Sequence, residues 1–431
     1  MKTLIENGRV MDPVSGRDEV AHVAIAAGRI VSVGQVPDGF APTRVVNALG
    51  QWVLPGLVDL SVRLREPGHE HEGMLESEMQ AAVTGGVTSL VCPPDTDPVL
   101  DEPGLVEMLK FRAEKLHQAR VFPLGALTRD LKGEALTEMA ELTESGCVGF
   151  SQAEYALIDT QVLSRAMQYA ATFGYTLWLR PQDAWLGKGV AASGPLATRM
   201  GLSGVPVSAE LIALHTIFEL MRSTQARVHL CRISSAAGLQ LVRQAKADGL
   251  PVTCDVSVHN LHLIDVDMGY YDARARLTPV LRQDADRKAL RAGLADGTID
   301  ALVSDHNPID ADAKNLPFAE AEPGATSVEL LASLAFKWAQ EDEVSPLRAV
   351  AAMTCGPAAV LGSTLGTLEA SAGRIVEGGV ADLCLFDPHA TRVITPVLLR
   401  SQGKHSPFMG HELAGQVRAT WVNGHPAYVA G

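Results

Sequence analysis

Between residues 57 and 361, strand-sized apolar runs alternate with amphipathic helical stretches. Ser89-Leu-Val-Cys92 precedes a helical stretch that starts at Gly104, and Arg227-Val-His-Leu-Cys231 precedes another that starts at Gly238. Repeated βα units over a segment of this length favour a parallel barrel over an open sheet. Reactive side chains in such a barrel lie at the C-terminal ends of the strands, so we expect the functional site in the loops that follow the apolar runs.

The two ends of the chain have a different pattern. Short apolar runs in the first 55 residues are separated by turn residues such as Asn7-Gly8 and Ala27-Gly28, and the C-terminal segment repeats this pattern up to Asn423-Gly424. Chain termini often lie close together. We therefore expect residues 1–55 and 366–431 to form one small β-sandwich, with residues 56–365 as the barrel.

Composition excludes several classes of partner. The chain has 36 Lys and Arg against 50 Asp and Glu, a formal net charge of −14, which disfavours nucleic acid or an anionic membrane as the main partner. We find no apolar run near the roughly 20 residues needed to cross a bilayer and no secretory h-region. The six cysteines lie far apart without a Cys-x-x-Cys pair, as is typical of reduced core thiols. We expect a cytoplasmic globular protein.

The barrel region opens on Gly56-Leu-Val-Asp-Leu-Ser-Val-Arg-Leu-Arg-Glu-Pro-Gly68, an apolar strand that runs into a polar loop. Further motifs follow in order: Cys92-Pro-Pro-Asp95, Gly146-Cys-Val-Gly-Phe-Ser151, Cys231-Arg-Ile-Ser234, Ser304-Asp-His306 and Ser406-Pro-Phe-Met-Gly410. Together they resemble the motifs of the dihydroorotases, in the cyclic amidohydrolase superfamily, over essentially the whole chain. The resemblance implies an α/β fold, a TIM-like (β/α)8 amidohydrolase barrel with a small β-sandwich. Active members close carbamoyl aspartate to dihydroorotate at a metal centre.

The resemblance also locates the positions at which active members bind zinc. Five of the six positions carry other residues here: Ser61, Arg63, Gln152, Arg180 and Arg232. Only Asp305 is retained. Zinc binds neutral imidazole nitrogen and anionic oxygen, whereas arginine is always protonated and has no lone pair to offer. We therefore expect no zinc, no other cofactor and no catalytic residue, with Asp305 as a vestige.

Substrate-binding positions are changed only in part. Arg65 matches the family arginine that binds the substrate carboxylate, whereas Asp95 and Thr278 replace asparagines and Asn260 replaces a histidine. The expected pocket thus consists of Arg63, Arg65, Asp95, Arg180, Arg232, Asn260, Thr278 and Asp305.

Two arrangements of this pocket are open. If all four arginines point into the barrel mouth, the pocket is cationic and suits a small anion. In the arrangement that we favour, Arg232 or Arg63 pairs with Asp305 and fills the space of the metal. We expect His229, three residues before Arg232 on a strand, to point the other way, towards the helices.

Two functions from different classes follow. The favoured one is a non-catalytic homologue, similar to the pseudo-dihydroorotases that in some bacteria assemble with aspartate transcarbamoylase. The resemblance implies the catalytic chain of that enzyme as the partner, and active relatives imply a homodimer. The alternative is an active metal-dependent cyclic amidohydrolase with a relocated centre built from His69, His71, His259, His306 and Asp305. It requires ligands on loops, which seldom hold a metal geometry tightly.

Overall fold

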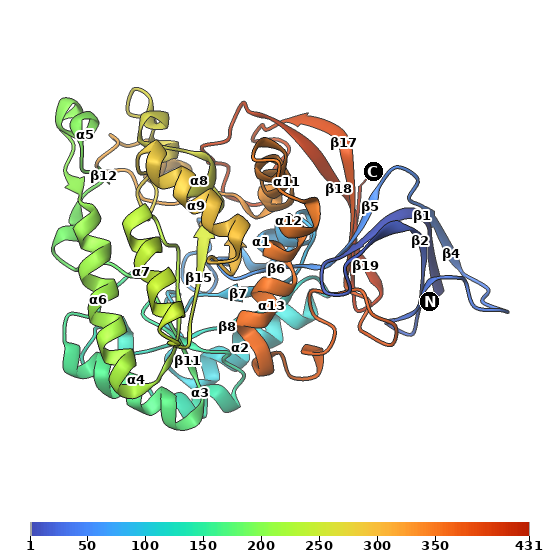
Figure 1. Ribbon diagram of the computed structural model, residues 1–431, viewed down its shortest axis with the longest axis horizontal. Helices are drawn as coiled ribbons and strands as arrows, with labels where there is room; N and C mark the ends of the chain where they lie inside the picture. The colour runs from blue at the N-terminus through green and yellow to red at the C-terminus, as the bar shows by residue number, and fades with distance from the viewer. Residues whose placement is uncertain (1, 431) are drawn as a thin grey trace.

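The computed structural model describes residues 2–430, and most of them form a closed parallel barrel (Figure 1). Its strand segments are β6 (Leu57–Asp59), β7 (Val87–Cys92), β8 (Arg120–Pro123), β9 (Gly125–Ala126), β10 (Phe150–Ser151), β11 (Thr176–Leu179), β14 (Arg227–Leu230), β15 (Val252–Ser257) and β16 (Ala301–Val303). Since β8 pairs with β7 and β9 with β10, these two segments act as one interrupted strand, and the nine segments make eight strands. A parallel bridge between Val62 and His306 closes the barrel.

Helices surround the barrel and cover the outward side chains of its strands. Leu177 and Val228, for example, belong to the same buried cluster as Leu163 and Leu214 of the surrounding helices. The principal helices are α1 (Leu75–Thr84), α2 (Pro103–Lys115), α3 (Met139–Glu144), α4 (Thr160–Phe173), α6 (Val207–Thr224), α7 (Ala236–Ala247), α9 (Asp284–Asp296), α11 (Leu331–Glu341), α12 (Pro346–Met353) and α13 (Cys355–Leu361).

Short elements extend the loops at the C-terminal ends of the strands. They are α5 (Pro195–Met200), α8 (Val258–His262), α10 (Ala311–Lys314) and the two-stranded pair β12 (Ala191–Ala192) and β13 (Gly204–Val205). The loops that carry these elements supply Lys188, Arg276 and Arg282 to the wall of the barrel mouth.

Both ends of the chain contribute to one eight-stranded sheet. Its strands are β1 (Lys2–Asp12), β2 (Arg17–Ala26), β3 (Arg29–Gly34), β4 (Arg44–Asn47), β5 (Trp52–Pro55), β17 (Leu383–Val393), β18 (Glu412–Val422) and β19 (His425–Val429). The N- and C-terminal parts join where β5 pairs antiparallel with β17. A second core, which includes Ile5, Val23, Leu383 and Trp421, holds this β domain together. The expected fold class, an α/β chain with a TIM-like (β/α)8 barrel and a small β-sandwich formed by the N- and C-terminal segments, is confirmed.

Residues 346–368 are apolar and long enough, by composition, to cross a membrane. The structure instead divides them into α12, α13 and a 3-10 helix, Gly362–Leu368, and 56% of the most apolar window is buried. Thr354 (φ −132°, ψ −90°) separates the first two helices, and Gly362 (φ 52°) ends the second. This segment therefore packs as short helices of the barrel layer.

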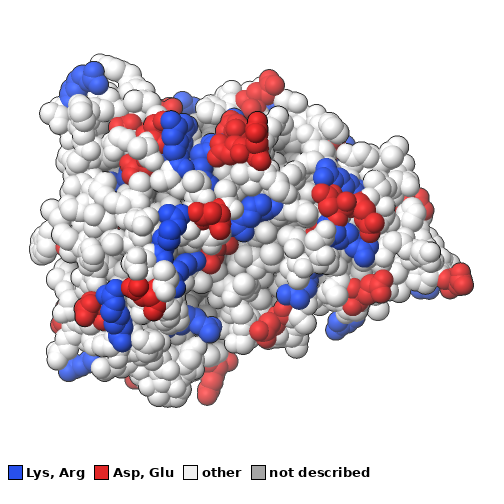
Figure 2. All heavy atoms as spheres, in the orientation of Figure 1, with Lys and Arg blue, Asp and Glu red and all other residues white. Residues whose placement is uncertain are grey.

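On the face of the molecule shown in Figure 2, small groups of Lys and Arg lie beside groups of Asp and Glu, so neither sign of charge dominates that face.

Candidate functional site

The loops after the barrel strands bring the expected site residues to one end of the barrel. Arg63 follows β6, Arg180 follows β11, Arg232 follows β14 and Asp305 follows β16. Arg232 (φ 59°) and Asp305 (φ 52°) have left-handed backbone conformations, which are costly for residues with a Cβ atom. Along a strand, successive side chains point to opposite faces. The left-handed turns at Arg232 and Asp305 interrupt this alternation, so it does not tell which way their side chains point.

A single carboxylate, Glu154, lies at the centre of three of the arginines. Its Oε1 accepts from Arg63 Nη2 at 2.8 Å and from Arg232 Nη2 at 2.5 Å, and its Oε2 lies 2.9 Å from Arg180 Nη1. Burial alone would raise the pKa of Glu154, but the guanidinium groups of Arg232, Arg180 and Arg63 hold it well below its usual range. Glu154 is therefore ionised at neutral pH.

Two further carboxylates complete the network around Glu154. Arg63 Nε donates to Asp95 Oδ2 at 2.9 Å, and Arg232 Nη1 donates to Asp305 Oδ1 at 2.9 Å. Burial lowers the pKa of Arg63, but Asp95 and Glu154 outweigh it and raise the pKa above its usual value. Three guanidinium groups thus face three carboxylates, and the network is close to neutral. It corresponds to the filled arrangement, with Arg232 paired to Asp305.

Glu154 was not among the residues expected from the sequence. It lies two residues after Gln152, and the left-handed turn at Ala153 (φ 50°) separates the two. Gln152 itself is buried and points elsewhere, donating to Leu131 O at 2.6 Å and accepting from Thr128 Oγ1. Counting the charges expected at the barrel mouth would have pointed to Glu154. Three buried arginines require carboxylates nearby, and Asp95 and Asp305 are one too few.

The side chains at the family's ligand positions do not fit a zinc ion. Arg63, Arg180 and Arg232 offer only N–H donors, and Ser61 Oγ lies 3.5 Å from Asp305 Oδ1. Asp305 is already bonded to Arg232. Zinc needs several lone-pair donors within about 2.3 Å, which this set of side chains does not supply.

The alternative arrangement, in which all four arginines point into an open cationic pocket, does not match the structure. Arg65 turns away from the other three: its Nε donates to Pro308 O at 3.1 Å and lies 2.9 Å from Glu72 Oε2. Asn260 donates to Val280 O, so it links α8 to a neighbouring loop and does not line the cavity. Thr278 does line the cavity, and its carbonyl oxygen accepts from Arg232 Nη1 at 3.4 Å.

His229 points into the barrel, which corrects the orientation expected from strand parity. Its ring lies 4.4 Å from that of Trp178, and its Nε2 lies 2.9 Å from Asp255 Oδ2. Asp255 also accepts the backbone N–H of Arg232. The strand β14 ends at Leu230, two residues before the left-handed Arg232, so the alternation that we used does not reach Arg232.

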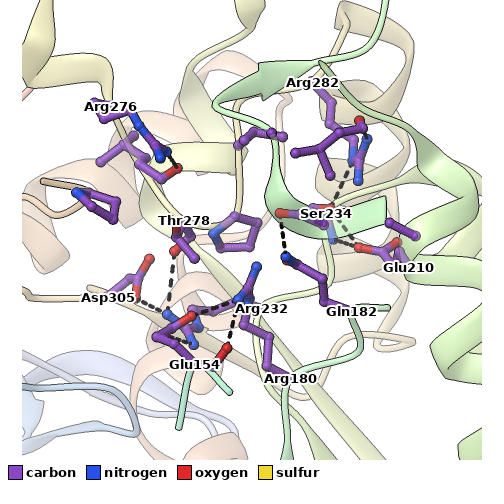
Figure 3. Close-up of a pocket in the computed structure, with 18 of the residues that line it drawn as sticks. Glu154, Arg180, Gln182, Glu210, Arg232, Ser234, Arg276, Thr278, Arg282 and Asp305 are labelled. Atoms are coloured by element: carbon purple, nitrogen blue, oxygen red, sulfur yellow. Dashed lines mark hydrogen bonds and ion pairs between the residues drawn. The ribbon is translucent and has the colours of Figure 1, made fainter. Parts of the chain in front are cut away.

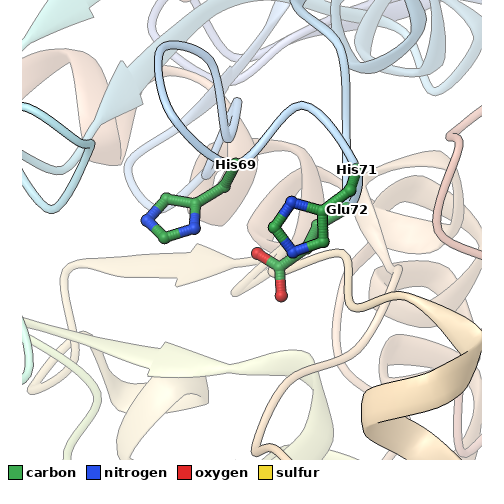
Figure 4. A group of neighbouring side chains, drawn as sticks. All are labelled: His69, His71 and Glu72. Atoms are coloured by element: carbon green, nitrogen blue, oxygen red, sulfur yellow. The ribbon is translucent and has the colours of Figure 1, made fainter.

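The five residues of the relocated-centre hypothesis do not come together. His69 and His71 lie on the loop after β6, where they approach Glu72 (Figure 4), and potential ligand atoms of the three residues lie within 4.8 Å of one another. His306 is fully buried and its Nε2 lies 2.8 Å from Glu78 Oε2. His259 is buried against Phe408.

A cavity of about 280 Å³ opens above the Glu154 network (Figure 3). Arg180, Arg232, Thr278 and Asp305 of the expected pocket line it. The sequence did not indicate several other lining residues, among them Gln182, Glu210, Ser234, Arg276 and Arg282. The barrel mouth therefore keeps a binding-sized space beside the paired arginines.

Known proteins with similar sequences cover the whole chain. A "Dihydroorotase-like protein" of Pseudomonas aeruginosa is 42% identical over 426 residues, 99% of each chain, and one of Pseudomonas putida is equally similar. A "Dihydroorotase" of Anaeromyxobacter sp. strain K is 38% identical over 99% of this chain and 98% of its own length.

Family models and solved structures agree with these relatives. The model "Dihydro-orotase-like" matches residues 50–237, and "Amidohydrolase family" matches residues 213–427. Among solved structures, the L-hydantoinase (dihydropyrimidinase) of Arthrobacter aurescens superposes with a TM-score of 0.87 at 21% identity, over 100% of this chain and 97% of the other. Together with the barrel and its β domain, these similarities show that the chain belongs to the dihydroorotase-like proteins of the amidohydrolase family.

Proposed function

We propose that this chain is a non-catalytic dihydroorotase-like protein of the cytoplasm, which acts in pyrimidine biosynthesis as an assembly partner. The observation that carries the proposal is the Glu154 network. Three guanidinium groups occupy positions at which the family binds zinc, and carboxylates from the barrel mouth neutralise them. Without a metal no bound water becomes nucleophilic for ring opening near neutral pH, and no Lewis acid polarises the carboxyl group that loses water in ring closure.

The partner that we propose is the catalytic chain of aspartate transcarbamoylase, with the protein itself as a homodimer. The resemblance to pseudo-dihydroorotases supports this choice. An exposed apolar surface beside the barrel mouth offers a contact region, since Tyr155, Ile158 and Trp185 are 61%, 64% and 66% exposed and line one cavity. Large exposed aromatic and aliphatic side chains are typical of contact sites between proteins.

The first experiment measures metal content and activity on one preparation. Protein purified without chelator is incubated with excess zinc and dialysed, metal per chain is determined by mass spectrometry, and dihydroorotase activity is assayed in both directions. We expect less than one tightly bound zinc per chain and no activity. One or two zinc ions per chain together with turnover would contradict the proposal.

Assembly is tested separately by co-expression with an aspartate transcarbamoylase catalytic chain and size-exclusion chromatography. We expect a joint complex whose transcarbamoylase activity depends on this protein. The double variant Tyr155→Ser and Trp185→Ser should weaken the complex and leave the fold unchanged, because both side chains are exposed. Separate elution of the two wild-type proteins would contradict the assembly role.

An active amidohydrolase with a relocated centre is the second candidate, because His69, His71 and Glu72 lie within ligand distance of one another. The Arg65 guanidinium beside Glu72 opposes a cation there. The test is the double variant His69→Asn and His71→Asn. Zinc-dependent turnover that disappears in this variant would favour the second candidate, whereas zinc binding without turnover would exclude catalysis at this loop.

A further inference from the structure

The cavity above the Glu154 network has more basic than acidic residues in its wall. The basic residues are Arg180, Lys188, Arg232, Arg276 and Arg282, and the acidic residues are Glu154, Glu210 and Asp305. Arg180 and Arg232 belong to the Glu154 network. The two oxygens of Glu210 accept from the backbone N–H and hydroxyl groups of Ser234 and Ser235, so its charge is stabilised without a cation. The wall thus has two more basic than acidic residues, and Arg276, Arg282 and Lys188 are its basic residues outside the Glu154 network.

Of the arginines in this wall, Arg276 has the fewest hydrogen-bond and ion-pair partners. Within residues 2–430 its side chain makes one hydrogen bond, a long one of 3.4 Å from Nη1 to Leu277 O, and its buried Nε has no partner. The same residues contain no carboxylate within ion-pair distance of it. Two residues earlier, Arg274 pairs with Asp272 through several short hydrogen bonds. A partly buried guanidinium group without a counter-ion is unfavourable, so an anion beside Arg276 would stabilise the site.

The surroundings of Arg276 hold its backbone and add a second guanidinium group across the cavity. Burial lowers the pKa of Lys314 to about 7, so this neighbour is only partly protonated at neutral pH. Lys314 is 2% exposed, and its Nζ donates to Ala273 O and Arg276 O at 3.1 Å each. Across the cavity, the buried Arg282 bonds only to neutral oxygens, Ser234 Oγ and Val205 O, in the described part of the chain. In Figure 3 Arg276 and Arg282 lie on opposite sides of the cavity, with Arg180 and Arg232 below them.

We propose that this cavity binds a small oxyanion, a phosphate or carboxylate group, with the guanidinium of Arg276 as its principal contact. The cavity volume of about 280 Å³ corresponds to roughly nine water molecules at ~30 Å³ each, which accommodates phosphate or a short dicarboxylate. A guanidinium fork binds either group through two parallel hydrogen bonds. The inference rests on the proposed function, because a metal centre would occupy the same barrel mouth.

Isothermal titration calorimetry of the full chain tests the inference. Inorganic phosphate and succinate are titrated separately into protein in EDTA at constant ionic strength, because they represent the two sources of an oxyanion. Arg276→Gln removes the unpaired guanidinium, and Arg274→Gln is the matched control, since Arg274 is paired with Asp272 and does not line the cavity. Circular dichroism and thermal unfolding establish that each variant is folded.

We expect one site per wild-type chain for at least one of the two anions. Arg276→Gln should weaken it at least about tenfold, as the loss of a charge-assisted hydrogen bond implies, and Arg274→Gln should leave it unchanged. Binding of one anion alone would support the site and identify the group that it prefers. If Arg276→Gln does not fold, Arg276→Lys keeps the charge without the fork and should still weaken binding severalfold.

Heat from neither anion would overturn the inference, as would equal weakening by both glutamine variants. Either result would leave the proposed function intact, because metal content and assembly are measured independently. Retained zinc with turnover would overturn the proposed function whatever the anions do.

Discussion

Three guanidinium groups share the Glu154 carboxylate, so the charge of Glu154 determines whether the buried network at the barrel mouth is electrically neutral. Its side chain is 30% exposed, whereas those of Arg63 and Arg232 are each 5% exposed. The arginines have given up most of their hydration and depend on the carboxylates for compensation. Removing one charge from such a network leaves the opposite charge buried and unpaired.

Glu154→Gln is therefore expected to destabilise the protein by about 3 kcal/mol, the low end for breaking a buried ion pair because water reaches part of Glu154. The double variant Glu154→Gln and Arg180→Gln should recover part of this loss, since it restores the balance of charge. Urea unfolding monitored by circular dichroism measures both. Asp130→Asn breaks the exposed pair with Lys132 and should change stability by less than about 1 kcal/mol. A Glu154→Gln variant as stable as this control would contradict the network's role.

At this scale the sequence predicted which residues gather and the pairing of Arg232 with Asp305, but not the central role of Glu154 or the pairing of Arg65. The motif positions of Arg63, Arg180, Arg232 and Asp305 placed them correctly at the barrel mouth. The turn that directs Glu154 inward lies within a loop that motif matching does not describe, and the pairing of Arg65 with Glu72 depends on the path of the following loop.

Among the elements, the short helix α8 carries two histidines that are buried in neutral form. Burial lowers the pKa of His259 to about 4 and that of His262 to about 3. His262 Nε2 contacts Leu334 O at 2.9 Å, whereas neither ring nitrogen of His259 has a hydrogen-bond partner among the described residues. In the unfolded chain both rings would take up a proton near their ordinary pKa.

This difference predicts how stability depends on pH. The folded pKa of His259 lies below the unfolded value of about 6.5, so its contribution is complete above pH 6.5 and declines as the pH falls towards 4. His259→Phe keeps an aromatic ring against Phe408 and cannot titrate. We expect the variant to gain roughly 2 kcal/mol relative to the wild type between pH 7.5 and pH 5, measured by urea unfolding at both pH values. Parallel pH profiles for the two proteins would contradict this assignment, and the exposed His389→Gln serves as control.

Element boundaries limited what strand parity could predict. β14 contains four residues, and the left-handed Arg232 follows soon after it. A three-residue offset therefore did not place His229 and Arg232 on opposite faces. The position of His229 inside the barrel depends on its register with Trp178 of β11 and Thr253 of β15, which no local sequence pattern encodes.

For the whole molecule, the cysteines define how the protein behaves towards thiol reagents. All six are free, four are buried, and Cys231 and Cys355 are partly exposed. Burial raises the pKa of Cys92, Cys147 and Cys384 to about 12, so these thiols carry little of the reactive thiolate at neutral pH.

We expect a chromogenic disulfide reagent to modify the native protein slowly, first at the partly exposed Cys355, because burial raises the pKa of Cys231 well above its usual value. In guanidinium chloride without reductant the reagent should count six thiols rapidly. Fewer than six thiols in denaturant would reveal a disulfide and contradict this expectation. Rapid reaction of more than two thiols in the native protein would show that the barrel opens easily.

The whole-molecule architecture was the part most accessible from sequence. The alternation of strands and helices predicted the barrel. Both ends of the chain have short apolar runs separated by turn residues, and this shared pattern predicted that they form one domain. What the sequence did not encode are the contacts between distant loops that gather Arg63, Arg180 and Arg232 around Glu154. These contacts depend on side-chain directions that are fixed only when the barrel closes.

The joining of β5 to β17 also has a consequence for protein synthesis. Leu383 emerges from the ribosome 383 − 55 = 328 residues after Pro55, roughly half a minute later at ~10 residues per second. Throughout this interval β5 lacks its β17 neighbour, and all the barrel strands from β6 to β16 are translated before the interval ends. The order of emergence thus favours a barrel that folds first, with the terminal sheet completed only as the last strands leave the exit tunnel.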